Sequence, residues 1–409
     1  MRDTTDFWRL ADSPGADRES RGSYLNRTRE RRFGRRIVMG SPGLEDGSME
    51  REQSIIEMAL ELGFDMAGIA PLAPPPAAER FQAWLDDGHH GSMAYLERNR
   101  DRICDPARIL GGGRSLLCLG LGHARAPVEL AGGGRVARYA AGRDYHNKVG
   151  KLLRRLGRRL AEAGLARGGQ RSIVDAGPLL ERSHGAEAGL GHESKAGHLL
   201  HRTHGPWFFL AELLLEEDLV PTLDRGTGSS PLPSCGTCTA CIDACPTGAI
   251  LEPGVVDARL CISYLTIENP DPVPVELRPH LGAWVFGCDV CSEVCPHGSR
   301  APDREDSLGT HKAVAEGSLV DWLECGDSFP EVFIGSPLKR PRRAGLARNA
   351  ALALGNSPSD VGREALLRAL TGDSSETVRE AAAWSLGRAH LSDKGVPDAL
   401  ERSRRQENA

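Results

Sequence analysis

Seven of the eleven cysteines fall into two runs whose spacing suits iron–sulfur clusters. The first run reads Cys235-x2-Cys238-x2-Cys241-x3-Cys245-Pro246, and the second reads Cys288-x2-Cys291-x3-Cys295-Pro296. Proteins with such runs bind two [4Fe–4S] clusters, and the fourth cysteine of one group ligates the other cluster. Two cubane clusters need eight thiolates, and Cys261, between the two runs, completes the set. The chemistry predicted from these residues is the transfer of single electrons.

A zinc pair and disulfides are the alternative uses of closely spaced cysteines. A zinc site has no need of a closely spaced third and fourth cysteine followed by proline. Disulfides form in oxidising compartments, whereas the sequence contains no signal-peptide pattern. The remaining cysteines, Cys104, Cys118 and Cys325, are expected to be buried apolar residues. We expect one cluster to bind Cys235, Cys238, Cys241 and Cys295, and the other to bind Cys245, Cys261, Cys288 and Cys291.

A group of basic residues near position 340 has the chemistry to bind phosphates. Lys339-Arg340-Pro341-Arg342-Arg343 stands directly ahead of a helical segment that also contains Arg348. Phosphate contacts position a nucleic acid without reading its bases, so these residues predict a nucleic-acid interface. The alternative is a solvated basic linker. Because the net charge of the chain is −5, any such interface must be a local basic patch.

Helical and extended patterns alternate between residues 49 and 228. Helices are predicted at 54–62, 81–85 and 149–163, and strands at 64–70, 115–122 and 172–174. This alternation predicts an α/β domain. Residues 1–48 are basic and lack apolar periodicity, so we expect a disordered extension. The longest apolar stretch, 207–215, is interrupted by Glu212 and is too short to span a bilayer, so we expect a soluble, cytoplasmic protein.

Two further domains are predicted after the α/β domain. The cysteine runs lie within residues 229–305, which we expect to form a ferredoxin-like domain that holds two [4Fe–4S] clusters. Residues 306–409 contain two similar helical segments, at 344–356 and 378–387, which share paired alanines and a Leu-Gly end. We therefore expect HEAT-like helical repeats there. Stacked repeats of this kind often serve as binding surfaces.

Several motifs of the chain resemble those of epoxyqueuosine reductases. In the cysteine region the motifs are CPTGAI at 245–250, VDARxCISYLTIE at 256–268 and GCDxCxxVCP at 287–296. Upstream the motifs are RYAxGRDYH at 138–146, VDxGPxLER at 174–182, AGLG at 188–191 and WFFLxE at 207–212. The resemblance extends over residues 54–390 and does not depend on the cysteine spacing alone.

The resemblance implies a cobalamin-dependent enzyme that catalyses the last step of queuosine synthesis in tRNA. In this family two [4Fe–4S] clusters deliver electrons to cobalamin in the α/β domain, and reduced cobalt attacks the ring that bears the epoxide. An acid protonates the epoxide oxygen, and loss of water leaves the alkene of queuosine. The implied partners are tRNA carrying epoxyqueuosine at the anticodon and an electron donor that the sequence does not identify. The protein is expected to be a monomer.

The resemblance places the proton donor at Asp175. This residue follows the predicted strand 172–174 and precedes Ala176-Gly177-Pro178. A turn there would hold its carboxyl at the sheet edge that ligands favour in open α/β sheets. Over an apolar corrin face the carboxyl would be desolvated and its pKa raised. An Asp175 that only caps the turn is the alternative, with Asp144 as the other candidate acid. The implied cobalamin contacts are Arg102, Asp175, Lys195, Leu199, Leu210, Leu213, Ser263 and Asp289.

Three other functions are compatible with parts of this pattern. A reductive dehalogenase-like reductase would share cobalamin and two clusters, but it would be expected to carry an export signal and to lack C-terminal repeats. A non-catalytic iron–sulfur protein that transfers electrons or binds a partner would leave the α/β domain without a purpose. A diverged relative that reduces another modified base is the third alternative. Cobalamin binding would separate the non-catalytic alternative from the enzymes.

Overall fold

The computed structural model describes residues 46–123, 126–223, 234–302 and 308–407. Helix α1 spans Asp46–Glu61, so residues 46–48 of the predicted extension belong to a helix, and the rest of that extension lies outside the described residues. The helix is followed by Gly63, whose φ of +106° is a conformation that glycine adopts without strain. The predicted helix therefore exists, with an earlier start.

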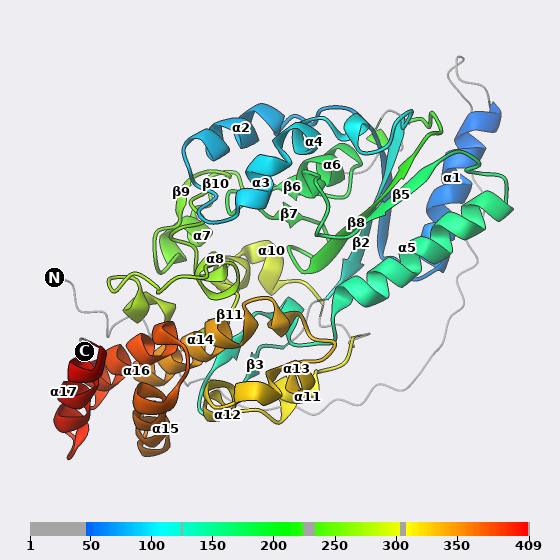
Figure 1. Cartoon of the computed structure of the whole chain (residues 1–409). Coiled ribbons are helices and arrows are strands. Elements are labelled where there is room, and N and C mark those ends of the chain that lie inside the picture. The colour runs from blue at the N-terminus through cyan, green and yellow to red at the C-terminus, as the bar shows by residue number, and fades with distance from the viewer. Residues whose placement is uncertain (1–45, 124–125, 224–233, 303–307, 408–409) are drawn as a thin grey trace, which may run out of the picture. The chain divides into compact units, whose positions relative to one another are not determined.

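A four-stranded sheet forms the centre of the N-terminal half (Figure 1). The strand order is β1-β2-β8-β5, and all three pairs are antiparallel. Every residue of β2 is buried, as the continuous apolar run predicts. Strand β8 is the other central strand, and the sequence prediction did not assign it. The four strands are β1 (Met66–Pro71), β2 (Ser115–Gly122), β8 (Phe208–Leu215) and β5 (Gln170–Ile173).

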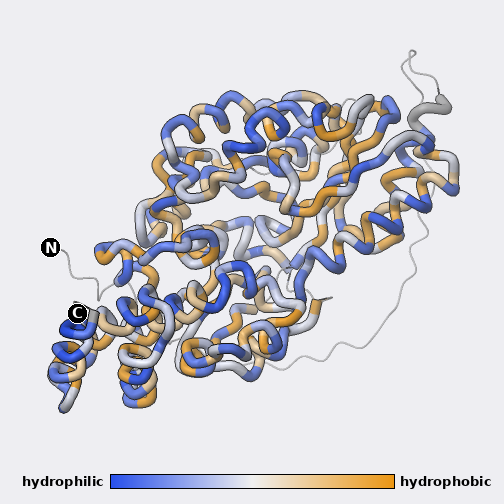
Figure 2. The backbone as a smooth tube through the Cα atoms, viewed as in Figure 1, coloured by the Kyte–Doolittle hydropathy of each residue, from blue (hydrophilic) through white to orange (hydrophobic). Residues whose placement is uncertain are grey.

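Helices cover both faces of this sheet. Helix α5, Tyr145–Glu162, and α1 pack on one face, and the short helix α6, Glu181–Glu187, packs on the other. Side chains of β8 alternate between these layers: Leu213 faces α5, whereas Leu214 lies in the layer of α6. Figure 2 shows hydrophobic residues along the central strands and alternating bands of polar and apolar residues along α5.

The antiparallel sheet corrects one part of the fold prediction. Helices and strands do alternate along the chain, but the carboxyl ends of antiparallel neighbours lie at opposite edges of the sheet. The rule that ligands bind at one shared carboxyl edge therefore does not apply to Asp175. Its place in the site depends on other contacts, which are described below.

A second core joins segments from all three predicted domains. Strand β11 pairs in parallel with β4, which pairs with β3, and residues 130–141 pack in one core with residues 262–286 and the C-terminal helices. The domain boundaries predicted at 228/229 and 305/306 lie outside the described residues. The strands of this small sheet are β3 (Val128–Glu129), β4 (Arg135–Val136) and β11 (Trp284–Phe286).

Residues 342–407 form two helical hairpins, after the short helices α11 (Lys312–Ala315), α12 (Leu319–Leu323) and α13 (Phe329–Val332). Equivalent helices of the two hairpins pack together, α14 on α16 and α15 on α17. A Cβ atom on Gly355 would lie 2.4 Å from Ser385 Oγ, so the glycine of the repeated Leu-Gly end permits this close packing. The description as HEAT-like repeats stays a prediction. The helices are α14 (Arg342–Asn356), α15 (Asp360–Gly372), α16 (Glu376–Ala389) and α17 (Val396–Glu407).

Within the described ranges, no helix has the length and apolar character needed to cross a bilayer.

Candidate active site

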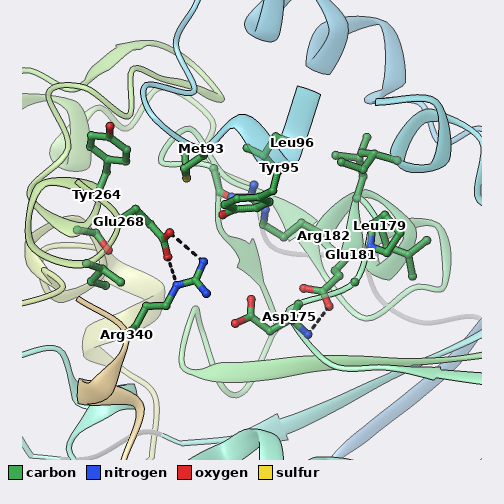
Figure 3. A pocket seen from close by; sticks show the side chains of 18 of the residues that line it. Met93, Tyr95, Leu96, Asp175, Leu179, Glu181, Arg182, Tyr264, Glu268 and Arg340 are labelled. Carbon is green, nitrogen blue, oxygen red and sulfur yellow. Dashed lines mark hydrogen bonds and ion pairs between the residues drawn. The ribbon is translucent and has the colours of Figure 1, made fainter. Parts of the chain in front are cut away.

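A cavity of about 1420 Å³ lies beside the central sheet, and Figure 3 shows part of its wall. Its walls come from α2 (Ala78–Asp86) and the short helices that follow, the N-terminus of α5, the loop after β5, α8 (Ile262–Ile267) and the start of α14. The cavity therefore gathers segments far apart in the sequence. Six of the predicted site residues line it: Arg102, Asp175, Ser263, Lys339, Arg340 and Arg342.

Asp175 is held in the cavity wall by the start of helix α5. Tyr145 donates its hydroxyl to Asp175 Oδ2 at 2.5 Å, and His146 Nε2 lies 3.2 Å from the same oxygen. Asp144 caps the helix, since its Oδ1 accepts from the His146 backbone N–H at 3.0 Å and lies 2.8 Å from His146 Nδ1. Helix α5 thus begins four residues before the predicted start, and its first turn supplies the partners of Asp175.

The charges of these groups correct the predicted protonation of Asp175. Burial alone would raise the pKa of Asp175, but hydrogen bonds from His146 and Tyr145 hold that pKa below its usual value. Hydrogen bonds to Asp144 and Asp175 raise the pKa of His146 to about 9. Asp175 is therefore a carboxylate near neutral pH, and the proton that the sequence reasoning placed on it resides on His146.

The backbone is unusual at two points of the cavity wall. In the described part of the chain, the non-glycine residues with positive φ are Asp175, at +55°, and Arg342, at +60°. Both line the cavity. Left-handed conformations of such residues are strained and gather at functional sites, where the surrounding structure holds them in place.

Two glutamates that the sequence reasoning did not assign to the site lie beside Asp175. Glu181 Oε1 accepts a hydrogen bond from the Asp175 backbone N–H at 2.9 Å, and Glu181 lines the cavity (Figure 3). Glu212 of β8 is fully buried next to Glu181. The sequence signal for Glu212 is that it is the single carboxyl group in the apolar stretch of residues 207–215.

The predicted phosphate-binding residues divide into two groups. Lys339, Arg340 and Arg342 are exposed and line the cavity, where Arg340 pairs with Glu268 at 2.8 Å. Arg343 instead forms a two-pronged ion pair with Asp373, at 2.7 and 2.9 Å.

Arg348 is only 1% exposed, so it cannot contact a phosphate, and the prediction for this residue was wrong. It donates to the backbone carbonyls of Leu265, Asn269 and Asp271.

Five of the predicted cobalamin contacts do not line the cavity. The Lys195 ammonium donates to the carbonyls of Gly236 and Cys238, which ties it to the cysteine loop. Asp289 is buried and accepts from the Arg138 backbone N–H at 2.8 Å. The three leucines pack in the apolar core, and Leu213 does so on the opposite face of the sheet from Leu210. The five residues are Lys195, Leu199, Leu210, Leu213 and Asp289.

The eight cysteines lie in or next to short helices and loops. Burial raises the pKa of Cys241, and the neighbouring Cys235 and Cys295 raise it further. Burial also raises the pKa of Cys261, and Cys245 adds to this effect. These neighbours lie within the predicted groups, and the division between two clusters stays a prediction. Cys291, which is assigned to the second group, lines a small cavity together with the four cysteines of the first group. Those four are Cys235, Cys238, Cys241 and Cys295.

The donor set fits iron–sulfur clusters. No three His, Cys, Asp or Glu side chains of the described residues converge closely enough to hold a single metal ion. The four thiolates of a cubane each bind a different iron, so they do not need to meet at one point. Cys104, Cys118 and Cys325 are buried, as predicted.

The cysteine array and the large cavity share a wall. Cys261 precedes α8 as its N-terminal capping residue, and Ser263 and Tyr264 of that helix line the cavity. Phe286 of β11 also lines it and stands two residues before Cys288. A cluster bound through Cys261 and Cys288 would therefore be attached within two residues of this wall.

Comparisons with known proteins identify both halves of this arrangement. Residues 104–176 match the family model "Epoxyqueuosine reductase QueG, DUF1730", and residues 234–298 match the "4Fe-4S double cluster binding domain". The second match covers all eight cysteines, which form a binding region for two [4Fe–4S] clusters.

The chain is also similar to curated and solved proteins. It is 37% identical to the epoxyqueuosine reductase of Pseudomonas aeruginosa, over 82% of this chain and 94% of that protein. It is 36% identical to that of Escherichia coli strain K12, over 82% and 88% of the two chains. The fold matches a solved epoxyqueuosine reductase with a tRNA-Tyr epoxyqueuosine-modified stem loop, with a TM-score of 0.75, 24% identity, and coverage of 88% of this chain and 100% of that one. The chain belongs to the epoxyqueuosine reductase family.

Proposed function

We propose that this protein reduces epoxyqueuosine in tRNA to queuosine. The curated relatives compared above are epoxyqueuosine reductases, and this chain covers 94% and 88% of their lengths. One solved relative contains a tRNA stem loop modified with epoxyqueuosine. The observation that carries the proposal is Asp175, held by Tyr145 and His146 in a large cavity that shares a wall with the cysteine array. This arrangement would bring the protons and the electrons of the reaction to one place.

The reaction consumes two electrons and two protons. Both bonds from carbon to the epoxide oxygen break, a carbon–carbon double bond forms, and the oxygen leaves as water. The electrons come from an external reductant, and clusters held by the eight cysteines would transfer them one at a time. Because an alkoxide is a poor leaving group, each break of a carbon–oxygen bond needs a proton donor.

The size and lining of the cavity support cobalamin as the cofactor. A volume of about 1420 Å³ exceeds the range of about 300–1,000 Å³ that is usual for small-ligand pockets. Apolar side chains such as Trp84, Leu96 and Ile267 line it together with Arg102 and Ser263. These residues would hold the cofactor, which when bound would supply a strong nucleophile of low potential.

Asp175 delivers a proton to the epoxide oxygen in this proposal. The proton begins on His146 Nε2, which faces Asp175 Oδ2 at 3.2 Å. The Tyr145 hydrogen bond fixes the orientation of the carboxyl group, and Asp144 orients the imidazole from the other side. A proton can thus pass from His146 through Asp175 to the substrate, and the carboxylate is restored afterwards.

Lys339 and Arg342 would contact phosphates of the tRNA at the cavity. Both are exposed, and both belong to the segment that leads into α14. Phosphate contacts at this position would hold the anticodon loop while its modified base enters the cavity. The HEAT-like hairpins behind this segment would serve as its rigid support.

The test is conversion of epoxyqueuosine to queuosine in tRNA by protein purified without oxygen. Protein with reconstituted clusters is mixed with cobalamin, a chemical reductant and tRNA that carries epoxyqueuosine, and the nucleosides are then analysed. Queuosine should form only when cobalamin and reductant are both present. No formation with protein that has full iron content and bound cobalamin would overturn the proposed function. Formation without cobalamin would overturn the cofactor assignment alone.

A further inference from the structure

Glu212 is a carboxyl group within an apolar layer. It lies on β8 between Leu210 and Leu214, on the sheet face that packs against α6, and its neighbours on the adjacent strands are Cys118 and Ile173. The residue is 0% exposed. An ionised Glu212 would find no hydrogen-bond donor for either oxygen among the described residues. An unsatisfied buried charge is strongly disfavoured, so Glu212 should carry a proton.

Among the described residues, Glu181 is the group that pairs with a protonated Glu212. Burial, and next the charge of Glu181, raise the pKa of Glu212 well above its usual value. Burial, and next the charge of Asp175, raise the pKa of Glu181 to about 7, although the hydrogen bond from Glu212 opposes this rise. Two carboxylates cannot bond to each other, so a proton on Glu212 is what joins the pair.

Glu181 connects this pair to the reacting side of the cavity. Its Oε1 accepts from the Asp175 backbone N–H at 2.9 Å, so the same carboxyl group holds the strained left-handed Asp175 in place. Figure 3 shows Glu181 and Asp175 side by side at the cavity wall. The Glu181 carboxyl group therefore lies beside the residue that delivers protons to the substrate.

We propose that Glu181 carries the second proton of the reduction and that Glu212, which stays neutral, stabilises the Glu181 carboxylate after that proton has left. This inference rests on the proposed function. The first proton, from His146 through Asp175, is added to the epoxide oxygen when the first carbon–oxygen bond breaks. The second passes from Glu181 to Asp175 and then to the resulting hydroxyl group, which leaves as water. Two electrons from the external reductant complete the balance.

Other charged groups surround the pair from each packed element. The loop after β5 contributes Asp175, and α6 contributes Arg182, whose charge favours an ionised Glu181. On the core side, Cys118 of β2 faces the pair, and its own pKa is raised by burial and then by Glu212. His184 and Glu187 lie farther along α6, where they face each other at 3.4 Å. Of these groups, Asp175, Glu181 and Arg182 line the cavity, whereas Cys118, His184 and Glu187 do not.

The first experiment measures the pH profile of kcat in Glu181→Gln. Glutamine can still accept from the Asp175 N–H, so the loop stays in place while the proton is lost. We expect kcat to fall about tenfold or more, KM for tRNA to stay unchanged, and the decline of the wild-type rate above about pH 7 to disappear. Glu187→Gln, on the same helix but outside the cavity, is the matched control and should behave as wild type.

Changes at Glu212 test the other half of the pair. Glu212→Gln keeps a donor for Glu181 and should retain the decline of kcat near pH 7. Glu212→Leu removes that donor, so the decline should move to higher pH. Infrared spectra of the protein without substrate give a readout that does not depend on turnover: a carboxylic acid band that persists above pH 8 should be absent from Glu212→Gln.

The outcomes separate this inference from the proposed function. Absence of any turnover in the wild-type protein contradicts the proposed function. Normal turnover whose pH profile is the same in Glu181→Gln as in wild type overturns the second-proton role. Loss of folding in Glu212→Leu would leave the glutamine variants and the infrared band as the deciding measurements.

Discussion

The hydroxyl of Tyr145 donates to Asp175 Oδ2 at 2.5 Å and so joins the first turn of α5 to the loop after β5. The Tyr145 ring stacks on Phe209 of β8, with ring centroids 4.1 Å apart, which limits the directions the hydroxyl can take. Asp175 is therefore oriented by a rigid helix and a central strand, although it lies in a loop. Such support from rigid elements is what a proton donor needs to reach the same atom in each turnover.

Replacing Asp175 by asparagine should lower turnover by a factor of about 100 or more. Asparagine tolerates the left-handed conformation found at this position, so the backbone should be preserved. The measurement is queuosine formation in single turnovers. Iron content and tRNA affinity should equal those of wild type, which separates loss of the proton from loss of structure. Near-normal turnover would transfer the acid's role to Asp144 with His146, or to water.

The stability of the folded chain should depend on pH through His146. Its pKa is raised to about 9 by hydrogen bonds to Asp144 and Asp175. The ion pairs therefore stabilise the fold fully below about pH 6.5, the usual pKa of an unfolded histidine, and this contribution is lost as pH rises through about 9. The side chain is 37% exposed, so solvent screening reduces the effect.

Melting temperatures of wild type and His146→Gln test this dependence. The two carboxylates stay ionised throughout, since the pKa values of Asp144 and Asp175 are both lowered. The advantage of wild type over the variant should be larger at pH 6 than at pH 10. An equal advantage at both values would mean that His146 does not carry the charge.

Replacing Cys261 by alanine should remove one cluster and spare the other. Wild-type protein reconstituted without oxygen should contain about eight irons, and the variant about four. Cys104→Ala, which changes a buried cysteine outside the array, is the control and should keep the full iron content. Zinc in place of iron, or an unchanged iron content in Cys261→Ala, would contradict the ligand assignment.

The cavity-lining cations should bind tRNA phosphates. Changing Lys339 and Arg342 together to glutamate should weaken tRNA binding. The dependence of log Kd on log salt should become less steep by about 0.7 to 0.9 for each phosphate that the variant no longer neutralises. Lys312→Glu, at an exposed lysine that pairs with Glu316, is the matched control. If the double variant binds as tightly as wild type, these residues form a solvated linker.

Arg348 should contribute to stability and not to binding. Its guanidinium donates to three backbone carbonyls of residues 265–271 and to Asn349, so Arg348→Met leaves these acceptors unsatisfied. We expect denaturant unfolding to show a loss of about 3 kcal/mol. At low temperature, where the variant remains folded, it should bind tRNA as wild type does. Weaker tRNA binding by the folded variant would contradict a purely structural role.

Sequence alone determined the parts of this protein whose chemistry is local. The cysteine spacing identified the cluster-binding region, because a loop that wraps a cluster needs its ligands close together in the chain. Apolar periodicity located α2, α5 and β2, because a side chain's direction follows directly from its position in a helix or strand. Glu212 was visible as a single charge in an apolar stretch, although its partner was not.

Only the tertiary structure decided the charges and neighbours of the site. The sequence predicted a raised pKa for Asp175, whereas its pKa is lowered. The reason is that hydrogen bonds from Tyr145 and His146, about thirty residues away, outweigh burial. Arg340 and Arg348 lie in one basic segment, yet one lines the cavity and the other is buried. The antiparallel strand order brings Glu212 beside Glu181. Each result depends on contacts between distant segments, which residue types and local spacing do not specify.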